Sequence, residues 1–105
     1  NYITCVFHRD HCQISEHNQI QKDLSIFGVA LTDIILIDDS PAHYIRQPYN
    51  TLLIKSFKGE TDDRELDSVA CFLQDLAEEL DVRPVRSKYV EFIGKMDTLD
   101  YYSKI

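Results

Sequence analysis

The chain has 105 residues, 44% of them apolar and 28% charged, which is the composition of a soluble globular protein of at most one domain. Its apolar runs are far shorter than the roughly 20 residues that span a bilayer, so we expect no membrane segment. A formal net charge of -7 opposes contact with a phosphate backbone, so we expect no direct binding of nucleic acid.

The first quarter of the chain predicts little regular structure. Residues 1–7 have the pattern of a strand entered in the middle of a domain, and residues 8–21 are polar, as in a surface loop or an irregular hairpin. A short apolar patch follows at Leu24, Ile26 and Phe27, and Gly28 closes it. Neither segment by itself indicates a function.

The cysteines of the chain predict a reducing compartment. Cys5, Cys12 and Cys71 cannot all pair, and their spacing suggests no disulfide framework. Cys5 and Cys12 do lie among three histidines between residues 5 and 17, and zinc prefers such ligands. The spacing fits no common zinc finger, so we interpret them as ordinary strand and turn residues and expect no zinc.

Two apolar runs predict strands of a parallel sheet. Residues 34–37 are continuously apolar and bounded by aspartates, which suits a strand buried on both faces and ended by Ser40-Pro41. Residues 51–57 form the second strand candidate, which Gly59 closes. With the helix that follows, they indicate an α/β layer pattern.

The clearest predicted helix covers residues 62–80. Asp62 and Glu65 have the spacing of a capping box. The acidic residues between 60 and 81 indicate a solvated helix face, with a docking surface for a basic peptide as the alternative. Cys71 points away from the apolar stripe. The stripe recurs at helical period and consists of Leu66, Val69, Ala70, Leu73, Leu76, Ala77 and Leu80.

The last part of the chain indicates a second amphipathic stretch over residues 84–96, followed by a tail at 97–105. Val85, Tyr89, Val90, Ile93 and Met96 would be the apolar members of that stretch. We therefore divide the chain into a domain segment, residues 1–96, and a tail.

Asp38-Asp39 is the most informative pair, because it directly follows the first predicted strand of the sheet. Ligands of open α/β sheets bind beyond the carboxyl ends of the strands, where carboxylates can hold Mg²⁺. The pair can also merely cap a strand and start a turn. A receiver domain would need a phosphoacceptor aspartate ending a later strand, and Asp81 follows the predicted helix instead.

Four blocks in order make the chain resemble the small phosphatases of the RNA polymerase II C-terminal domain, in the haloacid dehalogenase superfamily. The resemblance covers about residues 2–85 and implies a partial Rossmann-like α/β fold with parallel strands and a C-terminal amphipathic helix. The blocks are CVFHR at residues 5–9, KDLS at 22–25, LIDDSPAHY at 36–44 and PYN at 48–50.

The resemblance implies a role for each matching residue. Lys22 would neutralise the nucleophile and the transferring phosphoryl group, Asp38 would hold Mg²⁺, and Asp39 would ligate it more distantly, through water. Ser40 would shape the turn that holds Asp38, with a direct substrate contact as a secondary reading. The small phosphatases usually carry Asn where Asp39 stands and the larger polymerase phosphatases carry Asp, which leaves the subfamily open.

The chain departs from this pattern in two ways. The stretch between Arg9 and Lys22 is longer than in the small phosphatases, so the hairpin before the lysine should be extended. The DxDx(T/V) motif, which carries the nucleophile and the general acid, does not occur in the sequence, and neither does a recognisable second motif. We therefore expect the C-terminal half of a serine/threonine phosphoprotein phosphatase, inactive alone.

The expected partners are a phosphoprotein peptide, with the RNA polymerase II C-terminal domain as a candidate, and the missing N-terminal half of the domain. The expected location is nuclear or cytoplasmic. A function from another class stays open: a catalytically inactive phosphatase-like module that binds peptides, as in the mitochondrial import relatives of the family. Retention of Lys22 and Asp38-Asp39 favours the enzyme.

Overall fold

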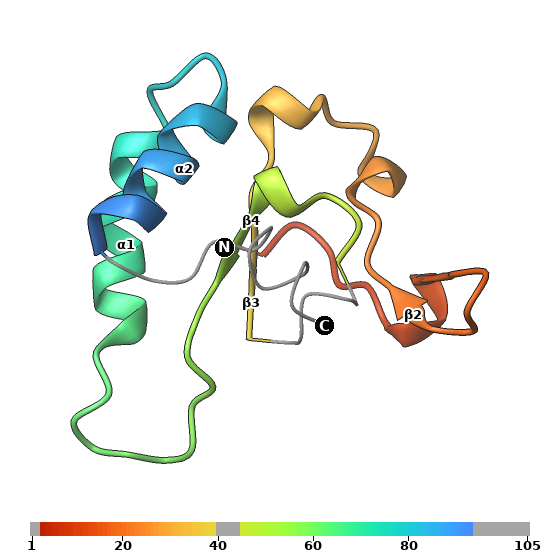
Figure 1. Cartoon of the computed structure of the whole chain (residues 1–105), viewed down its shortest axis with the longest axis horizontal. Helices are drawn as coiled ribbons and strands as arrows, with labels where there is room; N and C mark the ends of the chain where they lie inside the picture. The colour runs from red at the N-terminus through yellow and green to blue at the C-terminus, as the bar shows by residue number, and fades with distance from the viewer. Residues whose placement is uncertain (1–2, 40–44, 94–105) are drawn as a thin grey trace.

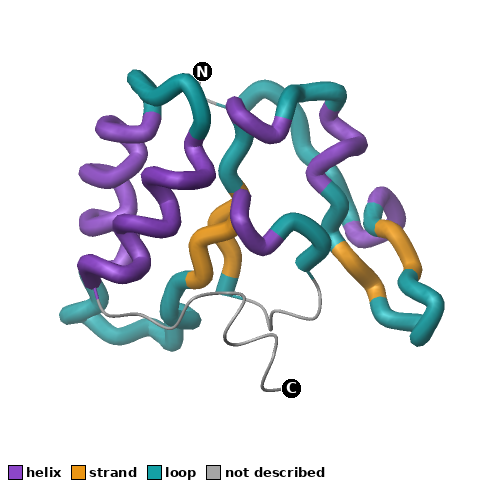
Figure 2. The backbone as a smooth tube through the Cα atoms, turned by 45° about the horizontal axis from the view of Figure 1, so that its top comes forward, coloured by secondary structure: helices purple, strands orange, loops and turns teal. Residues whose placement is uncertain are grey.

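The computed structural model describes residues 3–39 and 45–93, with the backbone alone for residues 92 and 93. In this part of the chain, a pair of parallel strands lies between two helices on one side and a small hairpin on the other (Figures 1 and 2). The fold is therefore mixed α/β, as the sequence predicts.

The parallel pair consists of β3, Leu36–Asp38, and β4, Thr51–Leu53. Leu36 lies opposite Thr51 and Asp38 opposite Leu53, and the Ile54 amide donates to the Asp38 carbonyl at 2.9 Å. The predicted parallel pairing is confirmed. Both strands are shorter than predicted, because a run of apolar residues forms a ladder only where a neighbouring strand lies in register.

The prediction that residues 34–37 are buried on both faces is wrong, since all four are only partly buried. Ile35 and Ile37 pack against the helices, whereas Leu36 faces a cleft on the other side. This alternation follows from the period of two along a strand. In the described residues, helices thus cover one face of β3, while its other face lines a cleft.

Helix α1, Glu65–Leu76, and helix α2, Val82–Ile93, enclose the core with β4 (Figure 1). The stacked rings of Phe72 and Tyr89, with centroids 4.0 Å apart, join the two helices. Pro84 is tolerated in α2 because it lies in the first turn, where amide groups lack partners within the helix. The buried residues of the core are Leu52, Val69, Phe72, Leu76, Val82 and Val90.

The predicted start and apolar stripe of α1 are partly wrong. The helix begins at Glu65 with Arg64 at the N-cap, and Asp63 rather than Asp62 binds the first turn, accepting from the Glu65 amide at 2.9 Å. Leu66 and Leu80 are 66% and 93% exposed. The helix turns Phe72 inward instead, because a large aromatic ring buries more apolar area than Leu66 would, and Leu80 lies beyond the helix end.

Cys71 is exposed, as predicted, and most acidic residues between 60 and 81 are exposed too, which supports the solvated face. None of the described helices has the length and apolar content that a membrane crossing requires.

The N-terminal part of the chain differs from a strand. Residues 3–8 form no regular element, and a short 3-10 helix follows at Arg9–His11. An extended segment becomes a strand only by pairing, and the ladders among the described residues do not include it. The predicted irregular hairpin is confirmed, as β1, Gln13–Ile14, pairs antiparallel with β2, Ile20–Gln21.

The difference between Phe72 and Leu66 can be tested by alanine substitution. Phe72→Ala should lower the free energy of unfolding by about 3–5 kcal/mol, because it leaves a cavity against Tyr89. Leu66→Ala should change it by less than about 0.5 kcal/mol, because that side chain is mostly in solvent. Urea unfolding followed by circular dichroism measures both, and equal losses would show that α1 buries the predicted stripe instead.

Candidate functional site

An ion pair between Lys22 and Asp38 forms the centre of the site. The Lys22 Nζ lies 2.5 Å from the Asp38 Oδ2, although the two residues are 16 positions apart. Asp38 ends β3, and Lys22 directly follows β2. The structure thus brings together two residues that the family resemblance assigns to one site, at the carboxyl end of a parallel strand.

Burial differs sharply between the two partners. The Asp38 side chain is 4% exposed and that of Lys22 is 46% exposed. A carboxylate this deeply buried is costly without compensating charge and hydrogen bonds, so the ammonium stabilises it in place. The exposed side of Lys22 leaves a cation in reach of an anionic group that enters from solvent.

Asp39 does not join this pair. It is exposed and lines a second cleft of about 370 Å³ with Lys55, Phe57 and Arg64 among its neighbours. In the described residues, no group of three or more His, Cys, Asp or Glu side chains converges as a metal site would. Mg²⁺ is commonly held by one or two carboxylates together with waters and substrate phosphate. The structure therefore places Asp38 against Lys22 and Asp39 in a separate cleft, and a role of either carboxylate in holding Mg²⁺ stays a prediction.

Asp23, the residue after Lys22, is the hub of a hydrogen-bond cluster that sequence reasoning missed. Its Oδ1 accepts from Gln47 Nε2 at 2.8 Å and from the Ser25 amide at 3.0 Å, and its Oδ2 accepts from Arg46 Nη1 at 3.2 Å. The hydrogen bond from Gln47, followed by the amide of Ser25, holds the pKa of Asp23 below its usual value. Asp23 before a short helical segment is a cap signal, whereas nothing in the sequence marked Gln47.

Buried polar groups then tie the site to β4 and α2. The Asn50 amide nitrogen donates to the carbonyls of Leu31 and Ile34, at 2.5 and 3.0 Å. Thr51 Oγ1 donates to the Gln47 carbonyl at 2.9 Å. Arg86, on α2, is fully buried, and its Nε donates to the Thr51 carbonyl at 2.7 Å. Sequence reasoning missed Arg86, because an arginine on an amphipathic helix is normally exposed.

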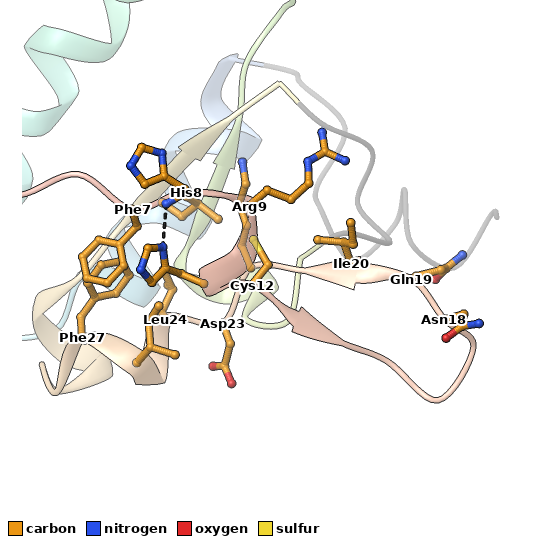
Figure 3. A pocket seen from close by; sticks show the side chains of 14 residues that line it. Phe7, His8, Arg9, Cys12, Asn18, Gln19, Ile20, Asp23, Leu24 and Phe27 are labelled. Atoms are coloured by element: carbon orange, nitrogen blue, oxygen red, sulfur yellow. Dashed lines mark hydrogen bonds between the residues drawn. The ribbon is translucent and has the colours of Figure 1, made fainter.

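A cleft of about 670 Å³ opens beside Lys22, between residues 7–12 and 18–27 (Figure 3). Its apolar wall includes Phe7 and Phe27, whose rings meet edge to face with centroids 4.8 Å apart. His8 and Arg9 come from the segment that follows Phe7 (Figure 3). The cleft thus combines apolar and cationic groups next to the ion pair.

The cysteines and histidines of residues 5–17 take separate places. Cys5 is exposed, whereas Cys12, His8 and His11 line the cleft. His11 Nδ1 accepts a hydrogen bond from the His8 amide at 2.8 Å, which marks a local turn. The absence of zinc stays a prediction, for metal analysis of the purified protein to test. Ser40 lies outside the described residues.

Comparison with known proteins gives a family and several relatives. Residues 1–83 match the model of the NLI interacting factor-like phosphatases. The chain is 42% identical over 69 residues to Phosphatase PSR1 of Saccharomyces cerevisiae, covering 66% of this chain and 16% of that protein. It is 37% identical over 79 residues to the human CTD small phosphatase-like protein, covering 75% of this chain and 26% of that one.

A third relative is the CTD nuclear envelope phosphatase 1 of Xenopus tropicalis, 34% identical over 82 residues, which are 78% of this chain and 33% of that protein. No solved structure gave a significant match. The chain belongs to the NLI interacting factor-like phosphatase family, and it spans a third or less of these relatives.

The cluster around Asp23 should make stability depend on pH. Because the folded-state pKa of Asp23 is lowered, its contribution is complete above the unfolded value near 3.8 and is lost as the pH falls below that value toward the folded one. Asp23→Asn should cost about 1–3 kcal/mol at pH 7 and flatten the loss of stability below pH 4. Urea unfolding at several pH values measures this.

Asp33→Asn is the matched control, since Asp33 is exposed. The assignment is contradicted if both substitutions change the free energy of unfolding equally. It is also contradicted if Asp23→Asn lowers that free energy only above pH 5.

Proposed function

We propose that this chain is the C-terminal half of a magnesium-dependent phosphoprotein phosphatase domain. The observation that carries the proposal is the buried Asp38 carboxylate, held by Lys22 at the carboxyl end of β3. A buried charge pair with one half-exposed cation suits a site in which negative charge arrives and develops. Membership of a phosphatase family supports the same reading.

In this proposal, each residue of the pair has one task. Lys22 would neutralise the attacking aspartate and the phosphoryl group, Asp38 would hold Mg²⁺, and Asp39 would ligate it more distantly, through water. Bound Mg²⁺ would supply positive charge against the phosphoryl oxygens. The attacking aspartate, which would form the aspartyl-phosphate and release it by hydrolysis, belongs to the DxDx(T/V) motif of a half that this sequence does not contain.

The domain itself is a proposal of the same kind. Residues 1–96 would form the C-terminal half of a Rossmann-like haloacid dehalogenase fold, which the missing N-terminal half would complete. Residues 97–105, which lie outside the described residues, would be a tail. Seven large apolar side chains among residues 3–29 support this, because they are exposed in the structure. They are Ile3, Val6, Phe7, Ile14, Ile26, Phe27 and Val29. Exposed apolar side chains of this kind are what the missing N-terminal half would cover.

The proposed substrate is a phosphoserine or phosphothreonine peptide, with the RNA polymerase II C-terminal domain as a candidate from the family resemblance. Two of the three relatives named above carry "CTD" in their names. A nuclear or cytoplasmic location is consistent with free cysteines at Cys5, Cys12 and Cys71 and with the name of the nuclear envelope relative. An inactive peptide-binding module is less favoured, because binding alone gives no reason to bury Asp38 against Lys22.

Substitutions at the ion pair test the proposal in the complete protein. With a phosphoserine peptide and Mg²⁺, Lys22→Ala and Asp38→Ala should each lower kcat by about 100-fold or more, as expected when charge stabilisation is lost at the transition state. Asp39→Asn should retain much of the activity, because an amide oxygen can also bind a water ligand. Unchanged turnover in Asp38→Ala would refute the assignment of the site.

The half-domain reading makes a separate prediction. The 105-residue chain alone should show no turnover, because stabilising groups without a nucleophile cannot complete the aspartyl-phosphate pathway. Adding a polypeptide that carries the missing half should restore magnesium-dependent hydrolysis, and adding it to Asp38→Ala should not. Phosphate release measures both. Robust turnover by the chain alone would mean that its nucleophile lies among these residues.

A further inference from the structure

We propose that Gln47 is the residue that positions Lys22, which deepens the proposed function and rests on it. The nitrogen and the oxygen of the Gln47 side-chain amide hydrogen-bond to the two residues after Lys22. Its Nε2 donates to Asp23 Oδ1 at 2.8 Å, and its Oε1 accepts from the Leu24 amide at 2.9 Å. The side chain thereby holds a segment 23 positions earlier in the sequence.

Lys22 needs such support, because its side chain is long and 46% exposed. A lysine carries about 2 kcal/mol of rotamer entropy, so the placement of its ammonium depends on how firmly its backbone is held. The Lys22 backbone itself touches the Gln47 segment, through a parallel bridge to Ile45 and a 3.4 Å hydrogen bond from the Arg46 amide to its carbonyl. Residues 22–24 are therefore attached to residues 45–47 at several successive points.

Gln47 is itself fixed to β4, which pairs with the strand that carries Asp38. Its carbonyl accepts from Thr51 Oγ1, and the Thr51 carbonyl accepts from buried Arg86. Thr51 begins β4 and lies opposite Leu36 of β3, the strand that ends at Asp38. The paired strands therefore position both partners of the ion pair. Asp38 lies on β3, and Lys22 is held through Gln47, which is bonded to β4.

The arrangement calls for an amide in particular. Glutamate at position 47 would keep an acceptor for the Leu24 amide but would set a carboxylate against Asp23. Methionine would keep the volume and lose both hydrogen bonds. The pair Gln47→Met and Gln47→Glu therefore separates the contribution of packing from that of the two hydrogen bonds.

The experiment measures kcat and KM in the complete protein with a phosphoserine peptide and Mg²⁺. Gln47→Met should lower kcat by about 10-fold or more with little change in KM, since a small misplacement of a catalytic group can cost about 100-fold. Gln47→Glu should lower it further. In a Lys22→Ala background, Gln47→Met should have no additional effect, because it acts through that lysine.

Two controls separate positioning from general destabilisation. Gln74→Met changes an exposed glutamine on α1 and should leave kcat unchanged. Val69→Ala weakens the buried core away from Lys22 and should lower the melting temperature while keeping kcat, when both are assayed well below that temperature. Circular dichroism confirms that each variant is folded at the assay temperature.

Several results would overturn the proposal: normal kcat in both Gln47 variants, an equal loss in Val69→Ala, or a Gln47→Met effect that multiplies with that of Lys22→Ala. These outcomes differ from a failure of the proposed function. If Lys22→Ala retains full activity, both ideas fall. If Lys22→Ala is inactive while Gln47→Met is normal, only the role of Gln47 falls.

Discussion

The parallel pairing of β3 with β4 is the constraint on which the rest of the described structure depends. It sets Asp38 opposite Leu53 at the end of the ladder, and it presents Ile35 and Ile37 to the helices while Leu36 faces the cleft. A shift of the register by one residue would exchange these faces and would place the buried carboxylate among the core side chains. The apolar core and the ion pair therefore rest on the same ladder.

Polar groups inside this small structure hold that register. Asn50, Thr51 and Arg86 are all buried, and each donates to a main-chain carbonyl near one of the strands. Removing a single partner from such a network leaves a desolvated group behind, which costs more than an average hydrogen bond contributes. This cost makes the network specific for one arrangement of β4, α2 and the segment that leads from Gln47.

Apolar side chains are buried in one part of the described structure and exposed in another. Around α1, α2 and β4 it has a closed core, with Phe72 stacked on Tyr89. Among residues 3–29, by contrast, large apolar side chains remain exposed, and the cleft beside Lys22 opens between them. The relatives that the chain matches are several times longer than the segment they share with it. The exposed side is where a further part of such a protein would find apolar surface to bury.

Much of the layout followed from local patterns. The apolar run before Asp38, the turn residues between the strands and the helical period after residue 62 predicted a parallel pair followed by helices. The ordered blocks predicted that Lys22 would meet Asp38, and it does. Local patterns did not predict which apolar residues of α1 are buried, because this helix carries apolar residues on more than one side. Leu66 is exposed, whereas Phe72 is buried by its contact with Tyr89.

The sequence alone therefore determined the parallel pair of strands, the helices that follow it and the two residues that form the ion pair. The periods of 2 and 3.6 and the order of the motif blocks are properties of neighbouring residues. Only the tertiary structure decided that Arg86 is buried, that Asp39 turns to a separate cleft and that Gln47 holds Asp23 and Leu24. Each of these depends on partners distant in the chain, and their burial and hydrogen bonds exist only once the strands and helices have packed.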